Sequence, residues 1–158
     1  MKERDIHRIR ESHARIVDPQ AFGARFYDRL FALRPQARRL FPPCLDAQVG
    51  KLVDMLDSIV RSLEAESLLQ QEFAELGRRH AGYGVSEDDY DDVGSALLMT
   101  LRECLGEAFT PEVEEAWATL YGDLAEAMIA AGQPPAPPIA SANRPAPDPL
   151  KQAPSARK

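Results

Sequence analysis

The chain has 158 residues, of which 44% are hydrophobic and 28% charged, a balance that suits one folded domain with a sizeable core. Its formal net charge of −6 argues against a nucleic-acid-binding protein, which would present a basic face to phosphates. No apolar run reaches the roughly 18–20 residues of a membrane span, and residues 1–10 lack the apolar core of a signal peptide. The two cysteines, Cys44 and Cys104, form no disulfide or metal pattern, so we expect reduced thiols in a cytoplasmic protein.

Residues 1–131 form the predicted folded domain, in which apolar residues recur at the three- and four-residue spacing of amphipathic helices. These stripes cover residues 6–16, 22–30, 49–63, 69–80, 90–105 and 113–128. No stretch alternates with the two-residue period of a β-strand over a strand's length. The pattern therefore predicts an all-α domain of about six to eight helices.

Capping residues and prolines mark where these helices begin and end. Three helix starts carry a polar capping residue, with proline directly after it in two of them: Asp18-Pro19, Thr110-Pro111 and Ser86 with Asp89. Residues 36–41 allow only a short turn before Pro42 and Pro43 end it. Because the second and third segments are short, a regular four-helix bundle is disfavoured.

The composition changes at Gly132. Residues 132–158 hold eight of the 13 prolines and no aromatic residue. Proline lacks an amide donor and blocks helices, so we predict a disordered, Pro-rich C-terminal tail. Four basic residues against one acidic residue give this tail a net charge of +3. It could bind an acidic surface or a proline-binding module, although such tails are more often solvated extensions.

His80 continues a helical stripe formed by Leu69, Phe73 and Leu76, at spacings of four, three and four residues. An imidazole on an inward face costs roughly 1–3 kcal/mol if one of its ring nitrogens stays unpaired. Taken alone, this stripe fits a core histidine held by a polar neighbour, and it also fits a histidine that binds a ligand. The rest of the chain favours the second interpretation.

Four stretches of the helical domain carry a recognisable order of residues. They are Phe26-Tyr27-Asp28-Arg29-Leu30-Phe31 with Pro35 and Leu40-Phe41; Gln48 with Leu52; Arg79-His80 with Tyr90; and Val93-Gly94, Leu97-Leu98, Leu105-Gly106, Ala116-Trp117 and Tyr121-Gly122. Together they resemble the bacterial haemoglobins, both the single-domain globins of the Vitreoscilla type and the globin domain of flavohaemoglobins. The similarity covers residues 6–131.

The resemblance implies a globin fold, a 3-on-3 sandwich of helices around a haem b, with His80 as the metal ligand. One imidazole nitrogen would bind iron while the other donates to a neighbouring acceptor. The same similarity implies further cofactor-binding residues. Leu76 and Val85 could line the haem on the side of His80, the proximal side, and Tyr90 would pack against the proximal histidine. Val93 is a further predicted cofactor-binding residue.

On the opposite, distal side, Tyr27 and Gln48 match positions that would stabilise a bound gas, and we assign them the catalytic role. A phenol that donates to bound O2 in a dry pocket contributes on the order of 1–3 kcal/mol, which slows oxygen release. Without the resemblance, Tyr27 is an ordinary core aromatic, and Gln48 is a solvated residue in the first turn of its helix.

Four more residues complete the predicted haem pocket. Phe41 matches the phenylalanine that packs flat on the porphyrin, and Leu52 would form an apolar wall that limits ligand size. Lys51 and Arg79 could each reach a haem propionate, although both are more often simply solvated charges.

One position departs from the flavohaemoglobin pattern. In that family a glutamate near the end of the last helix joins the tyrosine and the proximal histidine. The register carried forward from Tyr121 reaches Gly132, and the nearer acid, Glu126, lies on a polar face. This departure weakens the expectation of peroxidase-like chemistry.

The resemblance implies reversible binding of O2, and of NO and CO, for oxygen storage, delivery or gas handling. One alternative is a nitric oxide dioxygenase, which would need a separate flavin or NAD(P)H reductase because the proline tail follows the predicted globin domain. Another is a gas sensor that acts through a partner protein. A haemless globin-fold module is disfavoured by the joint presence of four residues of the pattern, Tyr27, Phe41, Gln48 and His80.

Overall fold

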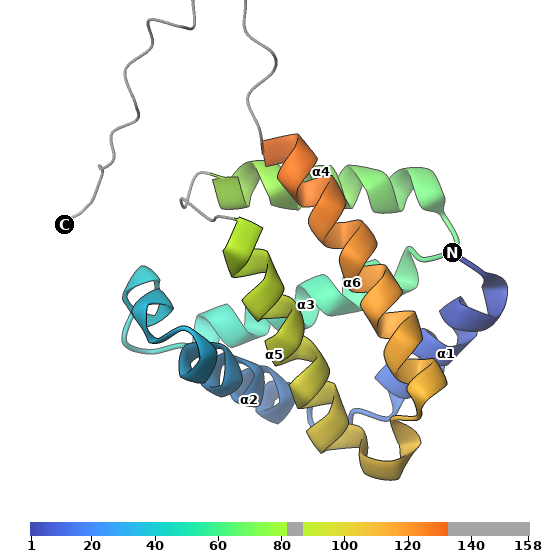
Figure 1. Ribbon diagram of the computed structural model, residues 1–158, viewed down its shortest axis with the longest axis horizontal. Helices are drawn as coiled ribbons and strands as arrows, with labels where there is room; N and C mark the ends of the chain where they lie inside the picture. The colour runs from blue at the N-terminus through green and yellow to red at the C-terminus, as the bar shows by residue number, and fades with distance from the viewer. Residues whose placement is uncertain (82–86, 133–158) are drawn as a thin grey trace, which may run out of the picture.

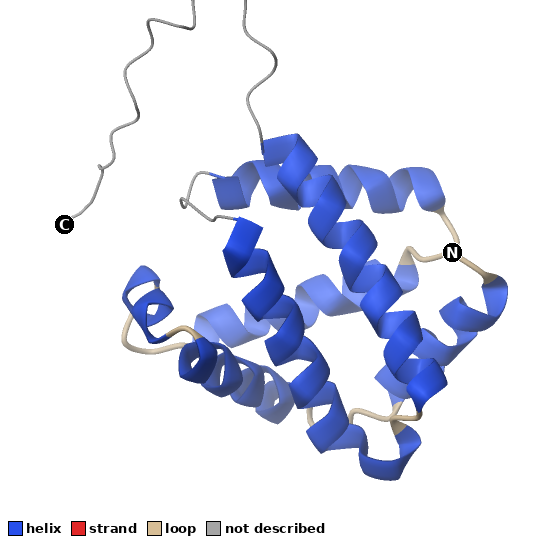
Figure 2. Cartoon of the chain, in the orientation of Figure 1, coloured by secondary structure: helices blue, strands red, loops and turns tan. Residues whose placement is uncertain are grey.

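The computed structural model describes residues 1–81 and 87–132. Over these two ranges the chain forms six α-helices and two 3-10 helices, without a β-strand (Figure 2). They are α1 (Glu3–Ala14), α2 (Pro19–Leu33), η1 (Pro35–Leu40), α3 (Asp46–Arg61), α4 (Glu66–Ala81), α5 (Glu87–Leu105), η2 (Gly106–Ala108) and α6 (Pro111–Gly132). The predicted all-α class is therefore confirmed for the described residues. Val85, Ser86 and the proline-rich residues 133–158 lie outside them.

The helix boundaries follow the capping signals closely. The Asp18 carboxylate accepts a hydrogen bond of 3.1 Å from the amide of Ala21 at the start of α2. The Thr110 hydroxyl accepts one of 3.2 Å from the amide of Val113 at the start of α6. Both caps satisfy amides that have no partner within their own helix. The first helix ends at Ala14, earlier than its apolar stripe predicts, because the chain turns there.

The helices pack in two main pairs, α4 with α6 and α2 with α5. In addition, α2 packs on α3, and α6 packs on α1 and α5. Figure 1 shows the result: the C-terminal end of α4, the N-terminal end of α3 and η1 lie on the same side of the view. Among the described residues, no helix is both long enough and apolar enough to cross a membrane.

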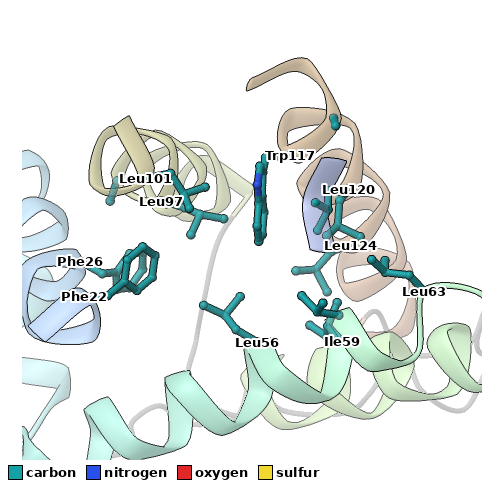
Figure 3. Close-up of a cluster of buried hydrophobic side chains, with 14 of the residues drawn as sticks. Phe22, Phe26, Leu56, Ile59, Leu63, Leu97, Leu101, Trp117, Leu120 and Leu124 are labelled. Atoms are coloured by element: carbon teal, nitrogen blue, oxygen red, sulfur yellow. The ribbon is translucent and has the colours of Figure 1, made fainter. Parts of the chain in front are cut away.

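Trp117 of α6 lies at the centre of the core and is only 1% exposed. Figure 3 shows its indole between leucines of α5 and of α6, facing the apolar side chains of α3. The indole N–H donates a 2.8 Å hydrogen bond to the hydroxyl of Ser12, which is itself buried. Because a buried indole N–H needs an acceptor, this bond fixes α6 against α1.

Two of the close helix crossings that require glycine lie beside predicted site residues. A Cβ atom built on Gly23 of α2 would lie 2.6 Å from Cγ1 of Val49 in α3. A Cβ atom on Gly77 of α4 would lie 2.7 Å from a backbone Cα of α6. Gln48 directly precedes the first contact and His80 follows Gly77 by three residues. These crossings therefore lie next to two predicted site residues.

Candidate functional site

Tyr27 and Gln48 form a hydrogen-bonded pair between α2 and α3. The Gln48 side-chain amide donates to the hydroxyl oxygen of Tyr27 at 3.2 Å. Tyr27 is only 5% exposed, and Gln48 is half-buried. Because the phenol oxygen accepts this bond, the phenol hydrogen can point at a third group.

The ionisation of Tyr27 suits a donor. Burial raises the pKa of its phenol, and the hydrogen bond from Gln48 opposes this rise only in part. Burial favours the neutral form because the phenolate would lose its hydration. At neutral pH, Tyr27 therefore keeps the proton that it would donate.

Aromatic rings surround Tyr27 on several sides. The ring of Phe41 lies 5.5 Å from that of Tyr27, centroid to centroid, in an edge-to-face arrangement. Phe31 lies 5.9 Å from Tyr27 and 5.5 Å from Phe41, and Phe26 lies 5.0 Å from Tyr27. Edge contacts of this kind orient the rings as well as bury them. The structure thus brings Tyr27, Phe41 and Gln48 together in one group, which we call the distal group.

His80 lies in the last turn of α4 and is half-buried. Its Nδ1 is 2.8 Å from the backbone carbonyl oxygen of Leu76, one turn earlier. Since a carbonyl only accepts, Nδ1 carries the hydrogen of this bond. In the neutral ring the lone pair is then on Nε2, which is the form in which histidine ligates a metal.

Tyr90, another predicted proximal residue, is held by α6. The hydroxyl of Tyr121 donates to the backbone carbonyl of Tyr90 at 2.6 Å. A Cβ atom on Gly94 would lie 2.7 Å from the ring of Tyr121, so the ring rests directly on the backbone of α5. Burial raises the pKa of both phenols, and for Tyr90 the charge of Asp89 adds to the rise.

The remaining predicted residues fall into two classes. Leu52 and Val93 are half-buried and pack against the core, and Leu76 is buried. Lys51 and Arg79 are exposed, and within residues 1–81 and 87–132 neither forms an ion pair. Val85 lies outside the described residues. The structure therefore packs Leu52, Leu76 and Val93 in or against the core and leaves the two cationic residues at the surface.

Two residues that touch this site were not singled out as site residues from the sequence. Arg38 reaches the carbonyl groups that follow Phe41, and Tyr121 holds Tyr90. Tyr121 was part of the family pattern, but its partner is a backbone atom and leaves no mark in the sequence. For Arg38 the only signal is its place just before two prolines, which remove backbone donors from the next turn.

Comparison with known proteins gives a consistent result. Residues 24–128 match the globin family model. Over 114 residues the chain is 34% identical to a flavohemoprotein of Bordetella pertussis, covering 70% of this chain and 28% of that protein. Over 143 residues it is 30% identical to a neuroglobin of Danio rerio, covering 81% of this chain and 90% of that protein.

Among solved structures, the chain is similar to a hexacoordinated heme protein from an anhydrobiotic tardigrade. The TM-score is 0.76 at 16% sequence identity, over 84% of this chain and 95% of that chain. At this identity the likeness concerns the fold alone. The sequence relatives include both a flavohemoprotein and a neuroglobin, so they do not single out the bacterial single-domain type. This chain spans about 28% of the length of the flavohemoprotein.

Proposed function

The chain belongs to the globin family, which confirms the predicted globin fold, and from this premise we propose that it binds a haem b and takes up diatomic gases reversibly. His80 would be the iron ligand, and the pair of Tyr27 and Gln48 would face the gas. The observation that carries this proposal is the bond from Gln48 to Tyr27, which leaves a buried phenol hydrogen for another acceptor.

The donor set of the protein fits haem better than a bare metal ion. Within the described ranges, no group of three or more His, Cys, Asp or Glu side chains could hold a metal. A single histidine holds iron firmly when a macrocycle supplies the other ligands. The bond from Nδ1 of His80 to Leu76 puts the ring hydrogen on Nδ1, which is the tautomer in which Nε2 would ligate iron. When bound, haem would supply an iron with a coordination position that accepts O2, NO or CO.

The chain's own residues would then determine how long a gas stays bound. Tyr27 would donate a hydrogen bond to the ligand, and such a bond to a partly charged acceptor contributes about 1.5–3 kcal/mol. Gln48 would orient the phenol by donating to its oxygen. Phe41, against the ring of Tyr27, would exclude water from the same space. These roles favour slow release of O2 and suit oxygen storage or delivery.

Nitric oxide dioxygenase activity is the second candidate function. The observation that favours it is the 34% identity to the Bordetella flavohemoprotein together with the buried Tyr27–Gln48 pair. A separate flavin or NAD(P)H reductase would return the iron to the ferrous state after each cycle. A role in gas sensing would likewise need a partner protein.

We further propose a cytoplasmic location. Both cysteines, Cys44 and Cys104, are free and exposed, which suits a reducing compartment.

The first test is uptake of haem by the purified protein, read from the Soret band. We expect one haem per chain, and absence of uptake would overturn the proposal. The oxy form is then mixed with NO in a stopped-flow instrument, with nitrate as the measured product. Sustained turnover with a flavin reductase and NADH would establish an enzyme. A single cycle without turnover would favour an oxygen carrier.

A further inference from the structure

Arg38 of η1 binds three carbonyl groups in the corner between η1 and α3. Its Nη1 donates to the carbonyl of Pro42 at 2.9 Å and to that of Phe41 at 3.4 Å. Its Nη2 donates to the carbonyl of Pro43 at 2.7 Å. The guanidinium also lies over the ring of Phe31, 5.4 Å from its centroid. A planar fork with several donors suits this geometry, whereas the ammonium of lysine offers a single point charge.

The corner itself, residues 41–45, has little other backbone support. Pro42 and Pro43 have no amide hydrogen to donate. The Phe41 amide bonds back to the carbonyl of Arg38 at 3.2 Å. The N-cap of α3 is Leu45, which makes no capping bond with its side chain. Segments with so few hydrogen bonds open easily, so the contacts of Arg38 supply much of what keeps this corner closed.

The corner connects two residues that touch the same phenol. Phe41 stands at its start and packs against Tyr27, 5.5 Å between ring centroids. Gln48 stands in the first turn of α3, just after the corner, and donates to the hydroxyl of Tyr27. A shift of the corner therefore moves Phe41 and Gln48 relative to Tyr27.

We propose that Arg38 is a positioning residue for the distal group. Arg38 holds the corner of residues 41–45 closed, and it thereby sets the Tyr27–Gln48 geometry and the retention of haem. The claim that Arg38 affects haem retention rests on the proposed function. The claim that Arg38 holds the corner closed concerns the chain alone and holds with or without haem. Opening of the corner would admit water beside Tyr27 and let the haem leave faster.

The neighbouring Arg39 offers a matched control. It is exposed, and its Nε donates to the carbonyl of Gln36 at 3.4 Å, within η1 itself. Arg38→Met keeps an unbranched chain over Phe31 but removes all three donated bonds. Arg39→Met removes the same charge and adds the same side chain one residue later. Arg38→Lys keeps the charge while losing the fork.

The experiment measures amide hydrogen exchange in haem-free protein and haem loss to excess apomyoglobin in loaded protein. For Arg38→Met we expect exchange of residues 49–52, the first hydrogen-bonded amides of α3, to accelerate about tenfold and haem loss to accelerate at least about fivefold, given the loss of three bonds. The stretching frequency of iron-bound CO should shift toward that of a pocket without a donor. Arg38→Lys should lie between Arg38→Met and wild type, and Arg39→Met should match wild type.

Several results would overturn the proposal. One is equal exchange of residues 49–52 in Arg38→Met and Arg39→Met. Another is exchange that rises equally in all helices, as a general loss of stability would cause. If Arg38→Met does not fold, the same comparison is made with Arg38→Lys. If the wild-type chain takes up no haem, the proposed function fails, while the exchange comparison still decides the role of Arg38. Altered exchange with unchanged haem loss and CO frequency would reject the claim that Arg38 affects haem retention and the distal geometry.

Discussion

The hydroxyl of Tyr121 in α6 donates a 2.6 Å hydrogen bond to the backbone carbonyl of Tyr90 in α5. This bond joins the last helix to the segment that carries the predicted proximal tyrosine. The flavohaemoglobin pattern would place a glutamate from the last helix near this tyrosine. In this chain the register of that glutamate falls on Gly132, and Glu126, an acid earlier in the same helix, is exposed. In the described part of α6, the polar group that reaches Tyr90 is therefore a neutral phenol.

Replacing Tyr121 by phenylalanine should destabilise the fold. The substitution removes one hydrogen bond and leaves the ring on Gly94, so we expect the free energy of unfolding to fall by about 1 kcal/mol. Urea denaturation followed by circular dichroism measures it. Tyr90→Phe is the control, because Tyr90 contributes its backbone carbonyl to this bond and keeps it after the substitution. An unchanged free energy of unfolding in Tyr121→Phe would show that the bond from Tyr121 has no stabilising role.

Stability should decline in alkaline solution, and Tyr121 should account for much of the decline. Burial raises the pKa of this phenol above its ordinary value of 10.0. Above that pH the unfolded chain loses the proton while the folded chain keeps it, so the unfolded state binds fewer protons. Stability is therefore full below pH 10.0 and falls as the pH rises from there toward the folded pKa.

The measurement compares the free energy of unfolding at about pH 9 and about pH 11 in wild type and Tyr121→Phe. The fall should be steeper in the wild type, because phenylalanine has no proton to lose. Tyr27 and Tyr90, whose pKa values burial also raises, should leave a smaller slope in the variant. Parallel curves for the two proteins would contradict this assignment.

The removal of His80 should separate haem ligation from folding. We expect His80→Gly to lose the Soret spectrum of a histidine-ligated haem and to recover it when imidazole is added, because a small ligand can fill the space left by the ring. His7→Ala is the control, since His7 is exposed on α1. An unchanged spectrum in His80→Gly would assign the iron ligand elsewhere.

The release of O2 tests the distal pair. Loss of the phenol donor in Tyr27→Phe should raise the O2 dissociation rate about tenfold or more, since about 1.5–3 kcal/mol of stabilisation is lost. Gln48→Leu should have a smaller effect, because Tyr27 keeps its hydrogen but loses the amide that orients it. Stopped-flow displacement of O2 by CO gives both rates. A larger effect for Gln48→Leu than for Tyr27→Phe would make Gln48 the direct donor.

The sequence predicted those features of the fold that depend on local patterns. The caps at Asp18 and Thr110 were readable because each cap acts on an amide three residues later. The family pattern predicted that Tyr27, Gln48 and Phe41 share a pocket, and the structure brings these three together. Contacts that depend on how far apart two helices pack could not be read in this way.

Arg38 and Gly77 illustrate what the sequence left open. Arg38 lies in a short, strongly basic segment that reads as a solvated turn, and its three acceptors are backbone atoms common to every residue. Gly77 reads as a weak point in a helix, since glycine costs about 1 kcal/mol there relative to alanine. Its function is visible only once α6 is in place, because the contact is with a backbone far away in the sequence.

Gly77→Ala should therefore lower stability, although alanine is the better helix former. The new Cβ atom would lie 2.7 Å from the Cα atom of Met128, so α4 and α6 would have to separate. We expect a loss of about 1–3 kcal/mol, typical of an overpacked contact. Gly122→Ala in α6 is the matched control, because a Cβ atom there meets nothing within 4 Å. That substitution should stabilise the protein by about 0.5–1 kcal/mol through helix propensity alone.

The same pair of variants also tests whether the α4–α6 crossing positions His80, which follows Gly77 by three residues in the last turns of α4. If the crossing sets the approach of the imidazole, Gly77→Ala should also weaken haem retention, measured as transfer to apomyoglobin at a temperature where both variants are folded. Gly122→Ala should retain haem as wild type does. Lower stability with unchanged haem loss would mean that α4 absorbs the extra methyl group without moving His80.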